Sequence, residues 1–300
     1  MASKKTPVVL YLFEKLESEG RTVATFDDVS AAIRDCNEKL GLELSENNPA
    51  NFMKDLLRGM NASKNWPSEL TAKRVSGRQL TGDGRIFEFV PFEDGQIEAF
   101  PNPFEPDGDE EEFVIESLSL PLATKTLGRE DEAWLVQVSV WMRLLENHFA
   151  RVSGQNLIEV SHLQNNIKLG RSEIDALFLA VEEQSDGSHH NVLITCEAKQ
   201  QKDPILGDQI TRQVSAAFRS IEHLELSVSK AIPIAVKAIK GKGSVYIVEF
   251  HDWSREEALL EEDKQKELSV ASKAIYRLIP PVPGIGFDRQ RQKGTVKPKL

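Results

Sequence analysis

Cysteine is scarce in this chain, and apolar runs of membrane-spanning length are absent from it. Only Cys36 and Cys196 occur in 300 residues, which favours two buried reduced thiols over a disulfide framework. The two cysteines and six histidines show no zinc-ligand spacing. No apolar stretch approaches the ~20 residues that cross a bilayer, and no signal-peptide pattern follows Met1. We therefore expect a cytoplasmic protein without a membrane partner.

Several common catalytic motifs are also missing. The chain has no phosphate-binding loop ending in Gly-Lys-Ser or Gly-Lys-Thr, no serine-hydrolase elbow and no internal repeat. Gly284-Ile285-Gly286 follows two prolines and opens no predicted helix, so it is not a dinucleotide-binding loop. These absences argue against an ATPase, a serine hydrolase or a nicotinamide-dependent enzyme.

The net charge of −10 comes from one segment. Residues 92–116 hold ten acidic residues and no lysine or arginine, and without them the remaining 37 acids equal the 37 bases. The segment also contains Pro101, Pro103 and Pro106, so residues 92–118 are interpreted as a solvated acidic linker between two domains. An alternative is that the segment mimics DNA and shields a basic surface of the free protein.

The most informative stretch is Glu173-Ile174-Asp175, followed by Glu197-Ala198-Lys199 at the end of the apolar run 192–196. Side chains alternate along a strand, so Asp175 shares a face with Glu173, and Glu197 shares one with Lys199. Charged groups in such apolar strands are costly unless something pairs them. Two or three carboxylates beside a lysine form a site for a hard cation, and a metal with a neighbouring amine can attack a phosphodiester.

The pattern around these residues predicts the order αβββαβ, followed by one more strand. The elements are a helix at 129–150, strands at 157–162, 173–182 and 192–199, a helix at 208–223, and strands at 231–239 and 244–250. Together with Asp175 and Glu197-x-Lys199, this order resembles the PD-(D/E)xK nucleases, the superfamily of restriction endonucleases and many repair nucleases. The resemblance covers about residues 125–250 and implies an α/β fold whose restriction-endonuclease-like core has a mixed sheet.

The resemblance also implies roles for the motif residues. Asp175, Glu197 and the carbonyl of Ala198 would bind Mg²⁺, or Mn²⁺ in its place, and Lys199 would orient or deprotonate the attacking water. The metal would lower the pKa of that water and neutralise charge on the scissile phosphate. The alternative is a buried ion pair of these acids with Lys199 that binds no metal.

Other candidates for the site remain open. Glu173 either reaches it or pairs with Arg171 or Lys168. Gln209 and Gln213, one helical turn apart, either position Lys199 or contact the DNA backbone, or else they serve as caps or are solvated side chains. The family often adds an acid from the helix ahead of the sheet, where the candidates are Glu130, Asp131, Glu132 and Glu146.

Residues 1–91 are predicted to form a separate domain. Helical spacing at 7–18, 27–40 and 49–58, a short β-prone run at 22–26 and two strands near 71–78 and 85–91 resemble a winged helix-turn-helix. Between residues 54 and 85 seven bases face three acids, on elements that contact DNA in this module. The DNA-binding candidates are Asn51, Lys54, Arg58, Lys64, Lys73, Arg74, Arg78 and Arg85. The alternative is a protein-interaction or dimerisation module.

The domain boundaries expected are 1–91 (winged helix), 92–118 (acidic linker), 119–279 (nuclease) and 280–300 (basic flexible tail). The function expected is Mg²⁺-dependent cleavage of double-stranded DNA by a homodimer, in restriction or defence, leaving a 5′-phosphate as the resemblance implies. Two alternatives stay open: a DNA-binding regulator with a non-catalytic nuclease-like domain, and a repair or structure-specific nuclease.

Overall fold

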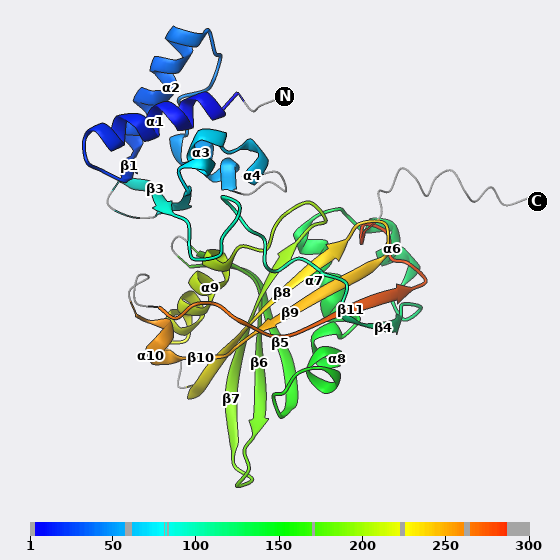
Figure 1. Cartoon of the computed structure of the whole chain (residues 1–300). Coiled ribbons are helices and arrows are strands. Elements are labelled where there is room, and N and C mark those ends of the chain that lie inside the picture. Colours follow the sequence, from blue (N-terminus) through cyan, green and yellow to red (C-terminus); the bar gives the residue numbers. More distant parts are fainter. Residues whose placement is uncertain are drawn as a thin grey trace, which may run out of the picture. The chain divides into compact units, whose positions relative to one another are not determined.

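The computed structural model describes residues 4–286 except 58–61, 81, 83, 170–171, 223–225 and 261–264. The chain divides into two compact units, Met1–Pro103 (unit 1) and Phe104–Leu300 (unit 2), so the division falls inside the segment expected to be a linker. Figure 1 shows the elements of both units. Within the described ranges, no helix has the length and apolar character that crossing a membrane requires.

Unit 1 combines helices with a three-stranded antiparallel sheet of order β1-β3-β2. Its elements are α1 (Thr6–Ser18), β1 (Val23–Thr25), α2 (Phe26–Leu40), α3 (Pro49–Leu57), α4 (Ala62–Asn65), α5 (Ser68–Ala72), β2 (Val75–Gln79) and β3 (Arg85–Pro91). One apolar core, which includes Leu12, Ile33, Met53 and Phe87, joins the helices to the sheet. Unit 1 therefore has its own core.

Local sequence signals set the helix ends in unit 1. Thr25 Oγ1 accepts a hydrogen bond from the N–H of Asp28, whose carboxylate accepts from the N–H of Thr25, so a capping box begins α2. The same helix ends at Gly41 in the left-handed conformation, with φ 65°. Asn48 Oδ1 accepts from the N–H of Asn51 at 3.0 Å and caps α3 ahead of Pro49.

Two short helices, α4 and α5, were not expected. The strand predicted from residue 71 begins only at Val75, because α5 occupies 68–72. This helix follows Pro67 and buries a single leucine, Leu70. A helix of one turn with one buried residue leaves no apolar periodicity to detect.

Unit 2 is a mixed α/β structure built on an eight-stranded sheet of order β4-β11-β9-β8-β7-β6-β5, with β10 paired to β8. The pairs β7–β8 and β4–β11 are parallel, and the other neighbours are antiparallel. The strands are β4 (Glu111–Glu116), β5 (Leu157–Leu169), β6 (Ser172–Glu183), β7 (His189–Lys199), β8 (Val228–Ile239), β9 (Ser244–Phe250), β10 (Trp253–Ser254) and β11 (Val270–Ile279). The helices are α6 (Leu122–Leu127), α7 (Glu132–Trp141), α8 (Leu144–Arg151), α9 (Gly207–Ser220) and α10 (Arg255–Ala258).

The two faces of this sheet are covered differently. On one face, α7 and α8 bury a large cluster with the inner side chains of β6, β7, β8, β9 and β11. On the other, α9 packs Val214 and Phe218 against Leu193. Over β8, β9 and β11 on this second face, Phe104 packs on a cluster that includes Tyr246 and Phe250. In that region a segment of the acidic run therefore covers strands of the sheet.

The expectation of a linker over 92–118 is wrong for residues 111–116, which form β4 at one edge of the sheet. This strand pairs in parallel with β11, from Ala274 opposite Glu111 to Ile279 opposite Glu116. Phe113 stacks on Tyr276 with ring centroids 5.6 Å apart. Half of the residues of β4 are acidic, and its partner strand lies more than 150 residues later in the chain. For these reasons the composition of the segment does not predict a strand.

The single helix expected at 129–150 is two helices, because Arg143 has φ 52° and interrupts it. The apolar spacing continues through Leu145 and Phe149 after the interruption, so periodicity alone does not reveal the break. The hairpin expected at Gly241-Lys242-Gly243 does join β8 to β9, and both of its glycines have positive φ.

The basic tail expected at 280–300 is packed where the structure describes it. Val282 and Ile285 are fully buried in the core of unit 2, and Pro283 O accepts a hydrogen bond from Trp134 Nε1 at 2.8 Å. The expectation of a flexible segment is therefore wrong for 280–286. Residues 287–300, which contain the bases of the tail, lie outside the described residues.

Candidate active site

Strands β6 and β7 bring the predicted acids together. Asp175 lies one residue before Ala176, which pairs with Cys196 on β7. Its Oδ2 accepts a hydrogen bond of 2.8 Å from the N–H of Ala198. Glu197 and Lys199, on the same side of β7, are buried, with 4% and 8% of their surface exposed. The spacing therefore predicted the right neighbours.

Lys199 lies between two carboxylates from different elements. Its Nζ forms an ion pair with Glu197, two residues earlier on β7, and another of 3.3 Å with Oε1 of Glu132. Glu132 is the first residue of α7. The amine thus links the end of β7 to the start of the helix that covers one face of the sheet.

Helix α9 contributes Gln213, whose side chain is almost fully buried. Its Nε2 donates to the carboxylate of Glu197 and, at 2.9 Å, to the backbone carbonyl of Glu173. Glu197 is therefore held between an amine and an amide. The Oε1 atoms of Gln213 and Gln209 are both buried and have no hydrogen-bond partner among the residues that the structure describes, so each is an unused acceptor there.

The electrostatics of the cluster follow from three carboxylates around one amine. The pKa of Asp175 is raised to about 8, first by burial, then by Glu197 and to a smaller extent by Glu132, while the Ala198 N–H and Lys199 oppose the shift. Burial likewise raises the pKa of Glu132, although Lys199 opposes it. Burial acts to lower the pKa of Lys199, but Glu197 and Glu132 outweigh it and the pKa is raised. The cluster thus has a charged amine and more carboxylate than that amine neutralises.

The oxygen donors suit a hard divalent cation, although the described residues contain no ready-made group of three or more His, Cys, Asp or Glu side chains for a metal. Asp175 and Glu197 supply two carboxylates, and Ala198, whose N–H donates to Asp175 and which follows Glu197 in the chain, supplies a backbone carbonyl. An added positive charge would relieve the crowding that raises the pKa of Asp175. The donor set therefore fits Mg²⁺ in its chemistry.

Glu173 does not join the cluster. Its side chain is half exposed and its Oε1 lies 3.7 Å from Nζ of Lys168, which is one of the partners that the sequence allowed. Arg171, the other partner considered, lies outside the described residues. Only the backbone carbonyl of Glu173 contacts the site, through Gln213.

Among the four acids proposed from the preceding helix, the structure brings Glu132 to Lys199. Asp131 is instead the N-cap of α7, accepting from the N–H of Trp134 at 2.9 Å and pairing with Arg129 at 2.5 Å. Glu146 pairs with Arg143 at 3.2 Å, and Glu130 is exposed at the surface. The register of the first helical turn decides which acid points inward, and composition does not give it.

Lys237 lies beside the site but is not among the residues predicted from the sequence. It is opposite Lys199 in the parallel register of β7 and β8, it is 4% exposed, and it is paired with Glu105. Its signal was a lysine inside the apolar run 231–239, which is the same signal that marked Lys199.

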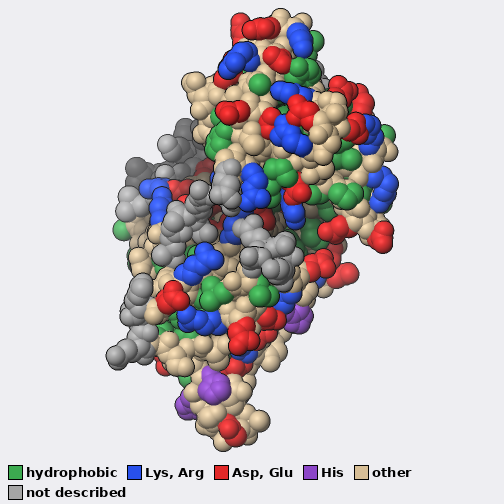
Figure 2. Space-filling view, turned by 90° about the vertical axis from the view of Figure 1, so that its left-hand side faces the viewer, with side chains coloured by type: hydrophobic (Ala, Val, Ile, Leu, Met, Phe, Trp, Pro, Cys, Tyr) green, Lys and Arg blue, Asp and Glu red, His purple; other side chains and the backbone are tan. Residues whose placement is uncertain are grey.

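The DNA-binding candidates of unit 1 lie at its surface, and acids pair some of them. Lys73 contacts Glu17 at 2.8 Å, and Arg78 contacts Glu88 at 2.7 Å. Arg74 packs over the ring of Phe92. On the face of unit 1 in Figure 2, basic and acidic side chains alternate rather than forming one continuous basic area. The remaining candidates that the structure describes, Asn51, Lys54, Lys64 and Arg85, are exposed or half-exposed, and Arg58 lies outside the described residues.

Comparisons of this chain with models of known protein families, with curated proteins and with solved structures give no match.

Proposed function

We propose that this protein is a metal-dependent deoxyribonuclease of the PD-(D/E)xK type. One observation carries the proposal: Asp175, Glu197, Lys199 and Glu132 converge from two strands and a helix, with more carboxylate than one amine neutralises. Buried ion pairs seldom add net stability, so such an excess of charge favours a functional role. In open α/β sheets, ligand sites also lie beyond the carboxyl ends of parallel strands. The cluster lies at the carboxyl end of β7, which is parallel to β8.

The element order supports the same class. Helices α7 and α8, strands β5, β6 and β7, helix α9 and strand β8 follow one another as αβββαβ. Asp175 belongs to the second strand of this series and Glu197-Ala198-Lys199 to the third, as in the nuclease motif. The parallel β7–β8 pair then gives the mixed sheet that this core requires.

In this mechanism Asp175, Glu197 and the Ala198 carbonyl would hold the metal. A divalent cation there supplies Lewis acidity, lowering the pKa of bound water and neutralising charge on the phosphate. Lys199 carries a proton at Nζ and is fixed by Glu132, so it orients the attacking water or stabilises the negative charge of the transition state. Gln213 fixes the rotamer of Glu197 and ties it to the start of β6.

For unit 1 we propose a winged helix that holds duplex DNA. Its order of helix, strand, helices and two final strands, with sheet order β1-β3-β2, supports this assignment, although the short helices α4 and α5 follow α2 and α3. Lys54, Lys64 and Arg85 are then the bases to test for phosphate contacts. Cleavage of both strands at one site would call for a homodimer, in which each copy supplies one active site.

The test is cleavage of plasmid and phage DNA by the purified chain in Mg²⁺, in Mn²⁺ and in EDTA. We expect discrete fragments with either metal and none in EDTA. Asp175→Asn should lose cleavage, whereas Glu173→Gln, on the same strand but outside the cluster, should retain it. Retained DNA binding without cleavage of modified or unmodified DNA would overturn the enzyme proposal and favour a DNA-binding regulator. Preference for branched substrates would indicate a repair nuclease.

A further inference from the structure

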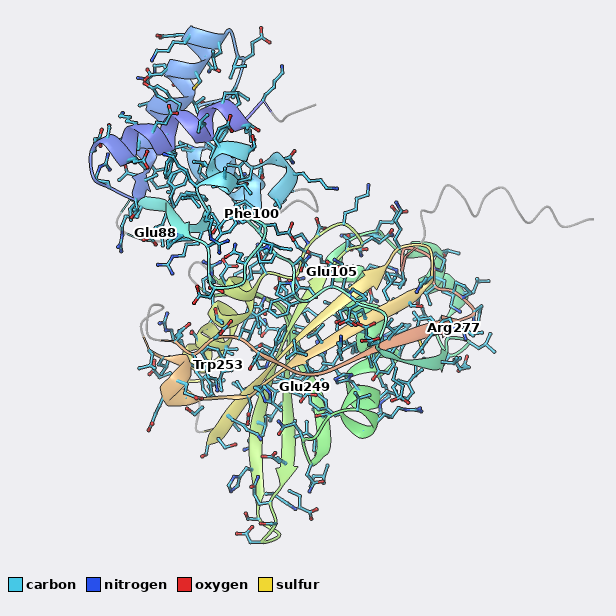
Figure 3. All side chains as sticks on the ribbon, in the orientation of Figure 1. Glu88, Phe100, Glu105, Glu249, Trp253 and Arg277 are labelled. Carbon is cyan, nitrogen blue, oxygen red and sulfur yellow. The ribbon has the colours of Figure 1, made fainter. Side chains whose placement is uncertain are left out.

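The acidic run is anchored on the sheet of unit 2. We define the acidic strap as residues 104–110. Within it, Glu105 pairs with Lys237 of β8, Asp107 lies 2.5 Å from Nζ of Lys273 on β11, and Glu110 lies 3.5 Å from the same amine. Just beyond the strap, Glu112 of β4 contacts Arg277 at 2.7 Å. Glu105 and Arg277 are labelled in Figure 3. The segment that carries the excess charge of the chain therefore contacts successive bases on two strands.

The bases under the strap lie on the same sheet face as the catalytic lysine. Residues in register on neighbouring parallel strands point to the same side, about 4.8 Å apart, so Lys237 is the lateral neighbour of Lys199. The register then runs from Lys237 to Tyr246 on β9 and from Tyr246 to Ile275 on β11. Lys273 is two residues from Ile275 and shares its side. A path of amines therefore leads from the active site to β11.

The strap has an anchored part and an exposed part. Phe104 packs edge-to-face on Phe250 with ring centroids 5.0 Å apart, and Glu105 covers the buried Lys237. Asp107 and its partner Lys273 are more exposed, at 58% and 30% of their side-chain surfaces. Exposed ion pairs contribute little to stability. The contact of Asp107 with Lys273 can therefore open while Phe104 stays in place, whereas the Glu110 side chain is buried and accepts from the N–H groups of Asp107 and Gly108.

We infer that Lys273 and Lys237 form a phosphate-binding surface leading to the active site, and that in the free protein the acidic strap occupies it in place of a nucleic-acid backbone. The inference rests on the proposed function, whose substrate is a chain of phosphates. A carboxylate and a phosphate oxygen make the same charge-assisted contact with an amine. The Lys273 contact also lowers the pKa of Asp107, as expected for an acid held ionised beside a base. Nucleic acid that takes these amines must displace the acids of the strap first, and Asp107 is the more exposed of the two acids at Lys273.

The test measures duplex binding in EDTA by fluorescence anisotropy on the full chain, so that no cleavage occurs. The variant Asp107→Asn/Glu110→Gln removes two acids that touch Lys273. The matched control, Asp109→Asn/Glu111→Gln, removes the same charge from exposed neighbours that lie outside the contacts with Lys273, Lys237 and Arg277. We expect the first variant to bind about three- to tenfold more tightly at 50 mM salt, with a log–log salt slope steeper by about one. Adding Lys273→Gln to it should remove this gain.

Equal tightening by both double variants would overturn the inference, because net charge alone would then explain it. So would unchanged or undetectable binding of the first variant in a chain that circular dichroism shows to be folded. The readout is independent of catalysis. If the chain binds but never cleaves DNA, the nuclease proposal fails. The strap inference is then still tested by the salt dependence of DNA binding. If it cleaves but the strap variants match their control, only the strap inference fails.

Discussion

The two ends of the parallel pair β7–β8 each hold a lysine between carboxylates, partly buried at Lys230 and buried at Lys199, yet they differ in charge. At the start of β8, Nζ of Lys230 contacts Glu182 at 2.7 Å, Asp252 at 3.1 Å and Gln155 Oε1 at 2.7 Å. All three protons of that amine thus have an acceptor. At the end of β7, Lys199 contacts Glu197 and Glu132, while Asp175 adds a third carboxylate to the cluster.

This difference separates a structural cluster from a candidate site. The Lys230 end has two acids for one amine, and the oxygen of a glutamine side chain accepts the remaining proton of that amine. The Lys199 end has three acids for one amine, and Gln209 and Gln213 keep buried oxygens without a hydrogen-bond partner. A buried lysine–carboxylate contact therefore does not mark an active site by itself. We propose that the excess of carboxylates over amines, together with the buried glutamine oxygens, marks the candidate site, because such groups suit a cation or a polar substrate.

A third buried cluster of unit 2 resembles the Lys230 end. His148 is fully buried, with Nδ1 3.1 Å from the Tyr276 hydroxyl and Nε2 2.9 Å from Ser272 Oγ. Glu249, labelled in Figure 3, accepts hydrogen bonds from Ser153 at 2.9 Å and from Ser272 at 2.6 Å. Each polar group is satisfied, so this cluster is expected to stabilise the packing of α8 on β9 and β11.

The largest effect expected is on catalysis and distinguishes the two lysines. Lys199→Met should lower the rate of DNA cleavage at least about a hundredfold, because the mechanism then lacks its positive charge beside the phosphate. Lys230→Met removes a similarly paired amine from the other end and should leave the rate within about threefold. Both rates are measured at 20 °C on chains whose fold is verified by circular dichroism. Equal losses would show that the two ends do not differ in function.

The next effect concerns stability and acid pH at the satisfied cluster. Burial acts to raise the pKa of Glu249, but hydrogen bonds from His148, Ser272 and Ser153 outweigh it, and the pKa lies below its usual value. Since the folded state holds this carboxyl ionised, its contribution is present above pH 4.5 and is lost as pH falls through the lowered pKa. Glu249→Gln should therefore cost about 2 kcal/mol at pH 7 and flatten the stability profile below pH 4.5.

Urea unfolding at pH 7, 5 and 3.5 measures that prediction. The loss caused by Glu249→Gln should shrink toward pH 3.5. A loss that stays constant with pH would mean that packing of the side chain, and not its charge, stabilises this region.

Each end also has a glutamine, Gln213 beside Lys199 and Gln155 beside Lys230, and substituting them should have a smaller effect on the rate of cleavage. Gln213→Leu frees the carboxylate of Glu197 from one of its holders and should lower cleavage about tenfold, equivalent to ~1.4 kcal/mol. Gln155→Leu at the Lys230 end should leave cleavage unchanged. If Gln213 acts by positioning Glu197, Gln213→Asn should be as slow as Gln213→Leu, and raised Mg²⁺ should partly restore both. Full activity of Gln213→Leu would remove it from the site.

How far the sequence predicts these clusters depends on the distance between their parts. Asp175, Glu197 and Lys199 come from neighbouring strands joined by a hairpin, so alternation and apolar runs place them together. To predict that Glu132 joins them, the first turn of its helix would have to be placed to within one residue. The pairing of Glu105 with Lys237 joins positions more than 130 residues apart, and the composition of the acidic run gives no reason to expect it. Short-range periodicity contains no information about such contacts.

The smallest expected effect is a change in stability. It measures the difference between the two ends most directly, because removing one acid should raise stability at the Lys199 end and lower it at the Lys230 end. Asp175→Asn replaces a carboxyl whose pKa is raised to about 8, so without metal at pH 7 it removes the free-energy cost of protonating that group on folding. The asparagine oxygen still accepts from the Ala198 N–H, so stability should rise by about 1 kcal/mol. Glu182→Gln removes one of two acids from a balanced amine and should lower stability by about 1 kcal/mol. Thermal melts in EDTA and in 10 mM Mg²⁺, roughly a hundred times a Kd of ~0.1 mM, should then show the parent chain and Glu182→Gln stabilised by the metal and Asp175→Asn unaffected. If Asp175→Asn is instead destabilised in EDTA, the Lys199 end is as balanced as the Lys230 end, and its carboxylates have no need of a cation.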